Sequence, residues 1–224
     1  MSLLAISADS FAHAPVVELK DSSTNQPIVI SWSLETSVAI YAHFENESDV
    51  DVIRFSVGTD QAEKGQPLYL HTLVPACSAY RELLPTLAVV GPIQEAIPVS
   101  GTGSQLPFSM KPDQGVALLQ NKRQGDTWFE PYSKKNYFWQ RSLRLNLSQP
   151  GEYTVYAWSA DKKIGDYVLA VGTRERWGLR EIGRAARHMP RLLSNREIHN
   201  KECRQELKRQ TPSPNPLPAD AHSG

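Results

Sequence analysis

The feature that most constrains this chain is a series of short segments in which apolar and polar residues alternate. In Val50–Val57, the side chains of Ile53, Phe55 and Val57 fall on one side of an extended backbone, so we expect them to face a core. The other early segments of this kind are 16–19, 28–32, 37–44 and 68–74. Asn, Asp, Gly and Pro cluster between them, where strands reverse direction. This pattern predicts short antiparallel strands joined by turns.

Three more strands are expected after residue 142. Leu143–Leu147 alternates Leu with polar residues and is followed by a turn. Tyr153–Trp158 carries large apolar side chains on both faces, which predicts that both faces are covered. Asp166–Val171 follows another turn, in the pattern of a hairpin. The fold class predicted is therefore all-β, an antiparallel, jelly-roll-like sandwich followed by a C-terminal basic amphipathic helix.

The chain divides by composition into a body and a tail. Residues 15–173 are enough for one sandwich, and the sequence has no long uncharged apolar run that predicts a transmembrane helix. Within them, residues 91–136 have little periodicity and predict a long excursion from the sandwich. Residues 174–209 form a basic helical tail, and the proline-rich residues 210–224 are expected to be disordered.

Charge is distributed unevenly although the formal net charge of the chain is zero. Residues 174–209 hold eleven Lys and Arg against five Asp and Glu, whereas the residues before them hold thirteen against eighteen. Ile182, Met189 and Leu193 lie on an apolar stripe of the predicted helix, which we expect to be interrupted at Pro190. Three interpretations are open: the helix lies on an anionic membrane surface, docks on the sandwich, or is simply solvated.

The N-terminus and the cysteines bear on the cellular compartment. Residues 1–14 contain Ala12–Ala14, an A-x-A pattern that resembles a signal-peptidase site, but no basic residue precedes the apolar stretch. This segment is either the remnant of an export signal or a disordered end. Cys77 and Cys203 lack the spacing of a metal site, so either a single bridge or two separate thiols is compatible with the sequence.

Two motifs carry a resemblance to a known family. DVDVIRFSV at 49–57 places Asp-x-Asp before a strand, and GEYTVYAWSADKKIGDYVLAVG at 151–172 places a G-x-Y strand before a G-D-Y-x-L strand. On these motifs the chain resembles bacterial pre-peptidase C-terminal domains, which are jelly-roll-like sandwiches attached to secreted enzymes and surface proteins. The resemblance leaves 91–136 unmatched. It implies an extracytoplasmic location, periplasmic, cell-envelope or secreted, and an accessory binding role without catalytic residues.

Asp49 and Asp51 are the metal-ligand candidates. Hard carboxylates at the entrance of a strand suit calcium, with Asp166 as a distant third ligand, and no other cofactor is expected. The alternative is that Asp49 and Asp51 accept hydrogen bonds in a turn and at a sheet edge. The six histidines are scattered, with no spacing that places two imidazoles on one face, so the sequence predicts no zinc site.

A cluster of aromatic residues supplies the ligand-binding candidates. Its members are Trp128, Phe129, Tyr132, Tyr137 and Trp139. Exposed aromatic rings stack on sugars or bind proteins, whereas the same rings could instead pack the excursion onto the sandwich. We therefore expect a glycan or protein ligand, and no nucleic acid because the body is acidic.

The leading functional hypothesis is a non-enzymatic, exported or envelope-associated binding or structural module. The sequence contains neither a G-x-S-x-G motif nor a phosphate-binding loop, so it predicts no catalytic residue. Two alternatives are a secreted hydrolase with its site in residues 91–136 and a calcium-stabilised structural domain.

Overall fold

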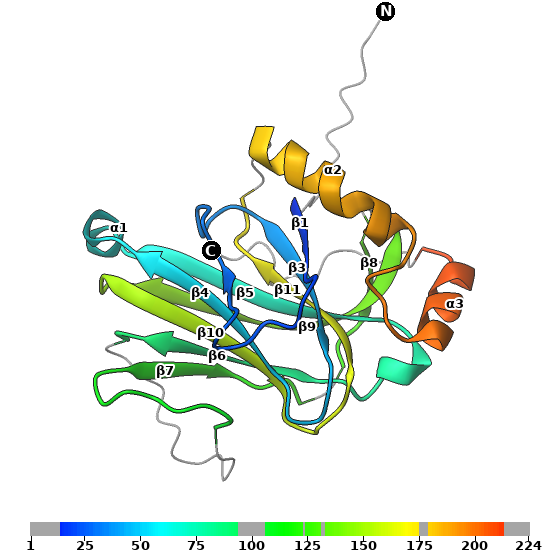
Figure 1. Ribbon diagram of the computed structural model, residues 1–224, viewed down its shortest axis with the longest axis horizontal. Helices are drawn as coiled ribbons and strands as arrows, with labels where there is room; N and C mark the ends of the chain where they lie inside the picture. Colours follow the sequence, from blue (N-terminus) through cyan, green and yellow to red (C-terminus); the bar gives the residue numbers. More distant parts are fainter. Residues whose placement is uncertain (1–13, 94–105, 123, 131–132, 175–178, 213–224) are drawn as a thin grey trace, which may run out of the picture.

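The computed structural model describes residues 14–93, 106–122, 124–130, 133–174 and 179–212. Two β-sheets pack face to face, and a helical tail lies along one side of them (Figure 1). The predicted class, an all-β sandwich with a C-terminal helix, is confirmed. The predictions for residues 1–13 and 213–224 lie outside the described residues.

One sheet has six strands and the other has five. In spatial order, the six-stranded sheet consists of β1 (Ala14–Val17), β3 (Val38–Phe44), β11 (Gly165–Val171), β5 (Gln66–Pro75), β9 (Lys135–Leu147) and β8 (Thr127–Glu130). The five-stranded sheet consists of β2 (Ile28–Val29), β4 (Val50–Val57), β10 (Gly151–Ser159), β6 (Pro85–Gly91) and β7 (Gly115–Leu119).

The sheets are mixed, which corrects the expectation of purely antiparallel strands. β1 pairs with β3 in parallel and β2 pairs with β4 in parallel, while the other pairs are antiparallel. A parallel pair needs a long connection, and residues 18–37 supply one between β1 and β3. Both parallel pairs lie at a sheet edge, where one short strand joins the rest.

The expected hairpin of the last two strands is wrong. β10 pairs with β4 and β6, whereas β11 pairs with β3 and β5 in the opposite sheet. Lys162, at a positive φ of 56°, lies in the short connection that arches from one sheet to the other. The turn residues between β10 and β11 thus mark a reversal of the chain, but they do not determine which sheet the chain enters next.

The main core lies between the sheets, and the faces of β4 and β10 agree with the alternation of their sequences. Ile53, Phe55 and Val57 are buried there, as predicted. Along β10, Tyr153 points into this core, while Tyr156 packs on the outer face, where the Phe108 ring stacks on it with centroids 3.9 Å apart. The prediction that both faces of this strand are covered is confirmed.

The segment 91–136 joins the sandwich at two places. β7 pairs with β6 at the edge of the five-stranded sheet, and β8 pairs with β9 at the edge of the six-stranded sheet. Where the structure describes it, this segment is thus not only an excursion but supplies an edge strand to each sheet. Residues 94–105 of the segment lie outside the described residues.

Four short helical elements complete the fold: α1 (Thr59–Glu63), the 3₁₀ turn η1 (Ser78–Tyr80), α2 (Leu179–Leu193) and α3 (Lys201–Arg209). Helix α2 continues through Pro190, which corrects the expected interruption there. Proline removes one backbone donor, and α2 ends at Leu193, less than one turn later. Among the described residues, no helix is both long enough and apolar enough to cross a membrane.

The tail is fixed to the body by packing and by a covalent bond. Leu192 of α2 is buried against the outer face of the six-stranded sheet. Cys203 of α3 and Cys77, next to η1, form a disulfide with their Cα atoms 5.4 Å apart. The sequence left the state of these cysteines open, and the structure pairs them.

Candidate metal centre

Two ligand candidates face each other on neighbouring strands. His43 lies near the end of β3 and Asp166 near the start of β11, and the antiparallel register places them directly opposite each other. His43 Nδ1 is 3.2 Å from Asp166 Oδ1, but the contact is not aligned as a hydrogen bond, and this buried nitrogen has no hydrogen-bond partner. The pair is rigid because both residues belong to strands inside the sheet.

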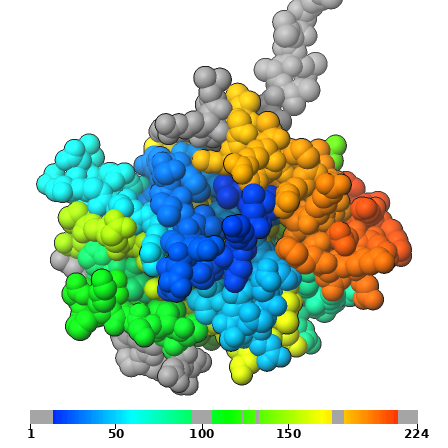
Figure 2. Space-filling view, in the orientation of Figure 1, coloured from blue at the N-terminus to red at the C-terminus, as the bar shows by residue number. Residues whose placement is uncertain are grey.

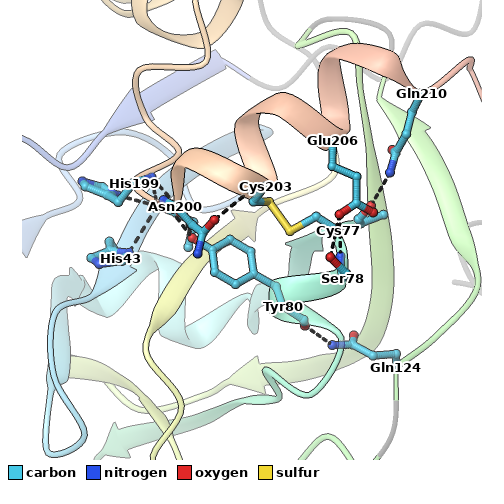
Figure 3. Close-up of a disulfide and its surroundings, with 12 residues drawn as sticks. His43, Cys77, Ser78, Tyr80, Gln124, His199, Asn200, Cys203, Glu206 and Gln210 are labelled. Atoms are coloured by element: carbon cyan, nitrogen blue, oxygen red, sulfur yellow. Dashed lines mark hydrogen bonds and ion pairs between the residues drawn. A yellow bond between two sulfur atoms is a disulfide. The ribbon is translucent and has the colours of Figure 1, made fainter.

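The third candidate comes from the tail. His199 lies between α2 and α3, and its Nδ1 is 2.5 Å from Asp166 Oδ1. Its backbone N–H also donates to Asp166 Oδ2 at 3.0 Å. The His199 ring stacks on His43 with centroids 4.0 Å apart, and Figure 3 shows one ring above the other. One ligand atom from each of these three residues lies within 4.8 Å of the others.

Local structure beyond His199 fixes its position. Asn200, the N-cap of α3, accepts a hydrogen bond from the Cys203 backbone N–H at 2.8 Å. Cys203 is bonded to Cys77, three residues before Tyr80, whose hydroxyl donates to Asp166 Oδ2. The disulfide therefore connects the backbone that carries His199 to the loop that carries a partner of Asp166 (Figure 3).

The carboxylate at the centre is held ionised by its partners. Burial alone would raise the pKa of Asp166, but hydrogen bonding to His199 and the contacts with His43 and Tyr80 hold the pKa below its usual value. The same hydrogen bond raises the pKa of His199, against the effect of burial. Side-chain exposure rises from 4% for Asp166 and 15% for His43 to 52% for His199, so the centre opens toward solvent on the tail side.

Gly165 allows the aromatic partner to approach. A Cβ at this position would come within 2.7 Å of the Tyr80 ring and 2.9 Å of the Leu83 side chain. A larger residue at position 165 would therefore push the Tyr80 ring away from the carboxylate of Asp166. The Gly-Asp pair that begins β11 thus combines a ligand candidate with the space for its hydrogen-bond donor.

A surface pocket adjoins the two histidines. Its lining includes Glu18, Tyr41 and Arg196 besides His43 and His199. It lies where the dark-blue β1 region meets the orange tail in Figure 2. Three protein ligands would leave a coordination position of a metal free, as in zinc sites that bind a water or a further ligand.

The predicted calcium ligands occupy different surroundings. Asp49 accepts a hydrogen bond from the Glu45 backbone N–H at 2.6 Å, within a turn. Asp51 is fully buried and accepts from the hydroxyls of Tyr167, at 2.7 Å, and Ser22, at 3.0 Å. These contacts match the alternative in which both carboxylates serve a turn and a strand, and calcium binding stays a prediction.

Asp51 also belongs to an acidic group beside the centre. Carboxylate oxygens of Glu18, Asp21 and Asp51 lie within 4.8 Å of one another. Burial and the neighbouring Glu18 raise the pKa of Asp51 to about 9, so this carboxyl keeps its proton near neutral pH. A cation would have to displace that proton, whereas the carboxylate of the histidine-containing cluster, Asp166, is already ionised, so that cluster is the better metal candidate.

Most of the aromatic residues predicted to bind a ligand lie close together, but they are packed inside the fold. Trp128 and Tyr137 are buried, and the Trp128 ring meets Trp139 edge to face with centroids 5.3 Å apart. They pack in the cluster under α2. Phe129 is half-buried on β8, and Tyr132 lies outside the described residues. Ligand binding by these rings stays a prediction.

No family model matches the chain, and no curated protein matches it. Among solved structures, the chain is similar to CorA, a surface-associated copper-binding protein important in copper acquisition by Methylomicrobium album BG8. The sequence identity is 10% and the TM-score 0.32, over 73% of this chain and 99% of that chain. A match at this level supports no inference about function, and the resemblance to pre-peptidase C-terminal domains stays a prediction.

Proposed function

We propose that the protein is an extracytoplasmic binding module whose ligand is a divalent transition-metal ion, held by His43, Asp166 and His199. The observation that carries this proposal is the convergence of three ligand atoms, within 4.8 Å, from three separate elements of the chain. Two imidazoles and one carboxylate suit zinc or copper better than calcium, which prefers six or more oxygen ligands. The Irving–Williams order further predicts that copper(II) binds more tightly than zinc.

Protons compete with the metal at this centre. A metal must replace the proton of the His199 ring and the hydrogen bond to Asp166. Because the pKa of His199 is raised, we expect metal affinity to increase with pH through the range in which this imidazole loses its proton. Asp166 is already ionised, since its pKa is lowered, and it supplies the negative charge.

An oxidising compartment is supported by the disulfide. Cys77 and Cys203 are 2% and 1% exposed, and their bridge spans the interface between tail and body. Stable structural disulfides are typical of the periplasm, the cell surface and secreted proteins. Thiol labelling of the protein under denaturing conditions, directly after lysis in alkylating buffer, tests this part; quantitative labelling of both cysteines would overturn it.

Metal binding is tested by titrating the purified, oxidised protein with zinc and with copper(II) in a calorimeter. We expect one ion per chain, and loss of at least tenfold in affinity in both His199→Ala and Asp166→Asn. The electron paramagnetic resonance spectrum of bound copper(II) reports nitrogen ligands directly, and we expect signals from two imidazoles.

Asp21→Asn is the matched control, because Asp21 belongs to the neighbouring acidic group and not to the proposed ligands. It should keep the affinity of the parent. No stoichiometric binding, or equal affinities in the parent, His199→Ala and Asp166→Asn, would refute the proposed centre. A loss confined to Asp21→Asn would place the ion in the acidic group instead.

A further inference from the structure

One apolar side of helix α2 packs against the six-stranded sheet. Ala185 and Leu192 are buried on it, and Leu192 packs against Tyr41 and Trp128 of the six-stranded sheet. His188, on the same side, accepts a hydrogen bond from the Val17 backbone N–H of edge strand β1 at 3.3 Å. The helix is thus docked on the body.

A second apolar stripe on α2 remains exposed. Ile182 and Leu193 are 54% and 53% exposed, and both belong to the five large hydrophobic side chains that stand out as exposed among the described residues. Ala186 is exposed between them. The spacings of four and seven residues place these three side chains on one side of the helix, about a third of a turn around the axis from the docked side. Figure 2 shows α2, in yellow and orange, along the surface of the molecule.

Arginines occupy the remaining side of α2. Arg187 and Arg191 are both exposed, one turn apart, and lie roughly a third of a turn from the exposed apolar stripe and from the docked side, so the outward half of the helix carries apolar residues on one flank and arginines on the other. The distribution of charge along the chain also makes the α2 side positive. Residues 174–209 carry eleven basic against five acidic residues, whereas the body is acidic. A negatively charged surface would therefore attract the α2 side of the molecule and repel the rest.

We propose that the exposed side of α2 binds an anionic lipid surface. The helix would lie flat, with Ile182 and Leu193 at the boundary of headgroups and acyl chains and with Arg187 and Arg191 on lipid phosphates. A protein partner fits less well, because stable protein interfaces bury about 800 Å² per partner around an apolar centre, which two large side chains on one helix do not provide. The proposal does not require a bound metal, although Arg191 also lines the pocket beside His43 and His199.

Co-sedimentation of the full chain with vesicles tests this inference. We expect binding to vesicles of mixed phosphatidylcholine and phosphatidylglycerol, and little binding to phosphatidylcholine alone. The double variant Ile182→Asn/Leu193→Asn should bind about tenfold more weakly, because it loses apolar burial. Each of Arg187→Gln and Arg191→Gln should lose about fivefold, and high salt should lower the binding of the parent.

Ile164→Asn is the matched control. Ile164 is 50% exposed but lies in the connection between β10 and β11, away from α2 in sequence. This variant should bind vesicles as the parent does, and circular dichroism should show an unchanged fold in all variants. Absence of binding to anionic vesicles, equal binding to neutral vesicles, or an equal loss in Ile164→Asn would overturn the inference.

Discussion

Removing the disulfide is the perturbation whose magnitude the structure fixes best. Cys77 and Cys203 are 126 residues apart in sequence, so the bridge closes more than half of the chain into a loop. In the chain-entropy model, a loop of this size stabilises the folded state by about 5 kcal/mol through the unfolded ensemble. We therefore expect the double variant Cys77→Ala/Cys203→Ala to lose about that much free energy of unfolding.

The folded variant should keep its tail docked, because local contacts remain. Glu206 of α3 still accepts from the Ser78 backbone N–H at 3.0 Å, and Leu192 of α2 stays buried against the six-stranded sheet. Urea unfolding followed by tryptophan fluorescence measures the loss, and the parent treated with a reductant after unfolding is the matched control. A loss below about 1 kcal/mol would contradict the reasoning, since it would mean that the bridge does not constrain the unfolded chain.

Three further perturbations test the surroundings of the centre. Burial and the neighbouring Glu18 raise the pKa of Asp51 to about 9, so the free energy of unfolding should fall as pH rises from about 4 to 9; Asp51→Asn should flatten this slope in urea titrations at several pH values. Gly165→Ala places a methyl group against Tyr80 and should cost about 1–3 kcal/mol in the same assay, whereas Gly183→Ala, where a Cβ meets nothing, should be neutral or stabilising. Burial and nearby arginines lower the pKa of His188, so the stability that its neutral imidazole contributes should be lost as pH falls below its unfolded pKa of about 6.5; protonation at the lowered pKa should release the Val17 N–H and reduce the protection of α2 against hydrogen exchange relative to the intrinsic exchange rate at each pH.

Alternation of apolar and polar residues predicts which face of a sheet a side chain occupies better than it predicts which strands pair. In β10 it separates Tyr153 from Tyr156 correctly, because the period of two is a property of the extended backbone itself. It cannot predict that β10 and β11 enter different sheets, since a short turn can reverse a strand within one sheet or arch across to the other. The two parallel edge pairs escape prediction for the same reason.

The proposed metal centre could not be predicted by spacing rules, because each of its three candidate ligands comes from a different element. His43 and Asp166 meet only through the register of β3 with β11, which is a long-range pairing. His199 joins them only after the tail has docked, and the bridge to Cys203 was one of two open interpretations. Two features of the sequence point toward this site: the Gly165-Asp166 pair at the start of a strand and His199, four residues before Cys203. Neither pattern is specific for metal binding.

Because the centre combines two strand residues with one tail residue, metal binding should also hold the tail more tightly to the body. A ligand present at a hundredfold excess over its dissociation constant stabilises the bound state by about 2.7 kcal/mol. Openings that pull His199 away from Asp166 must break the metal site, while openings at the far edge strand β7 need not. Zinc should therefore slow hydrogen exchange in α3 and leave β7 unchanged, and His199→Ala should abolish this protection. Uniform protection of both elements would mean that the ion binds elsewhere or stabilises only the fold as a whole.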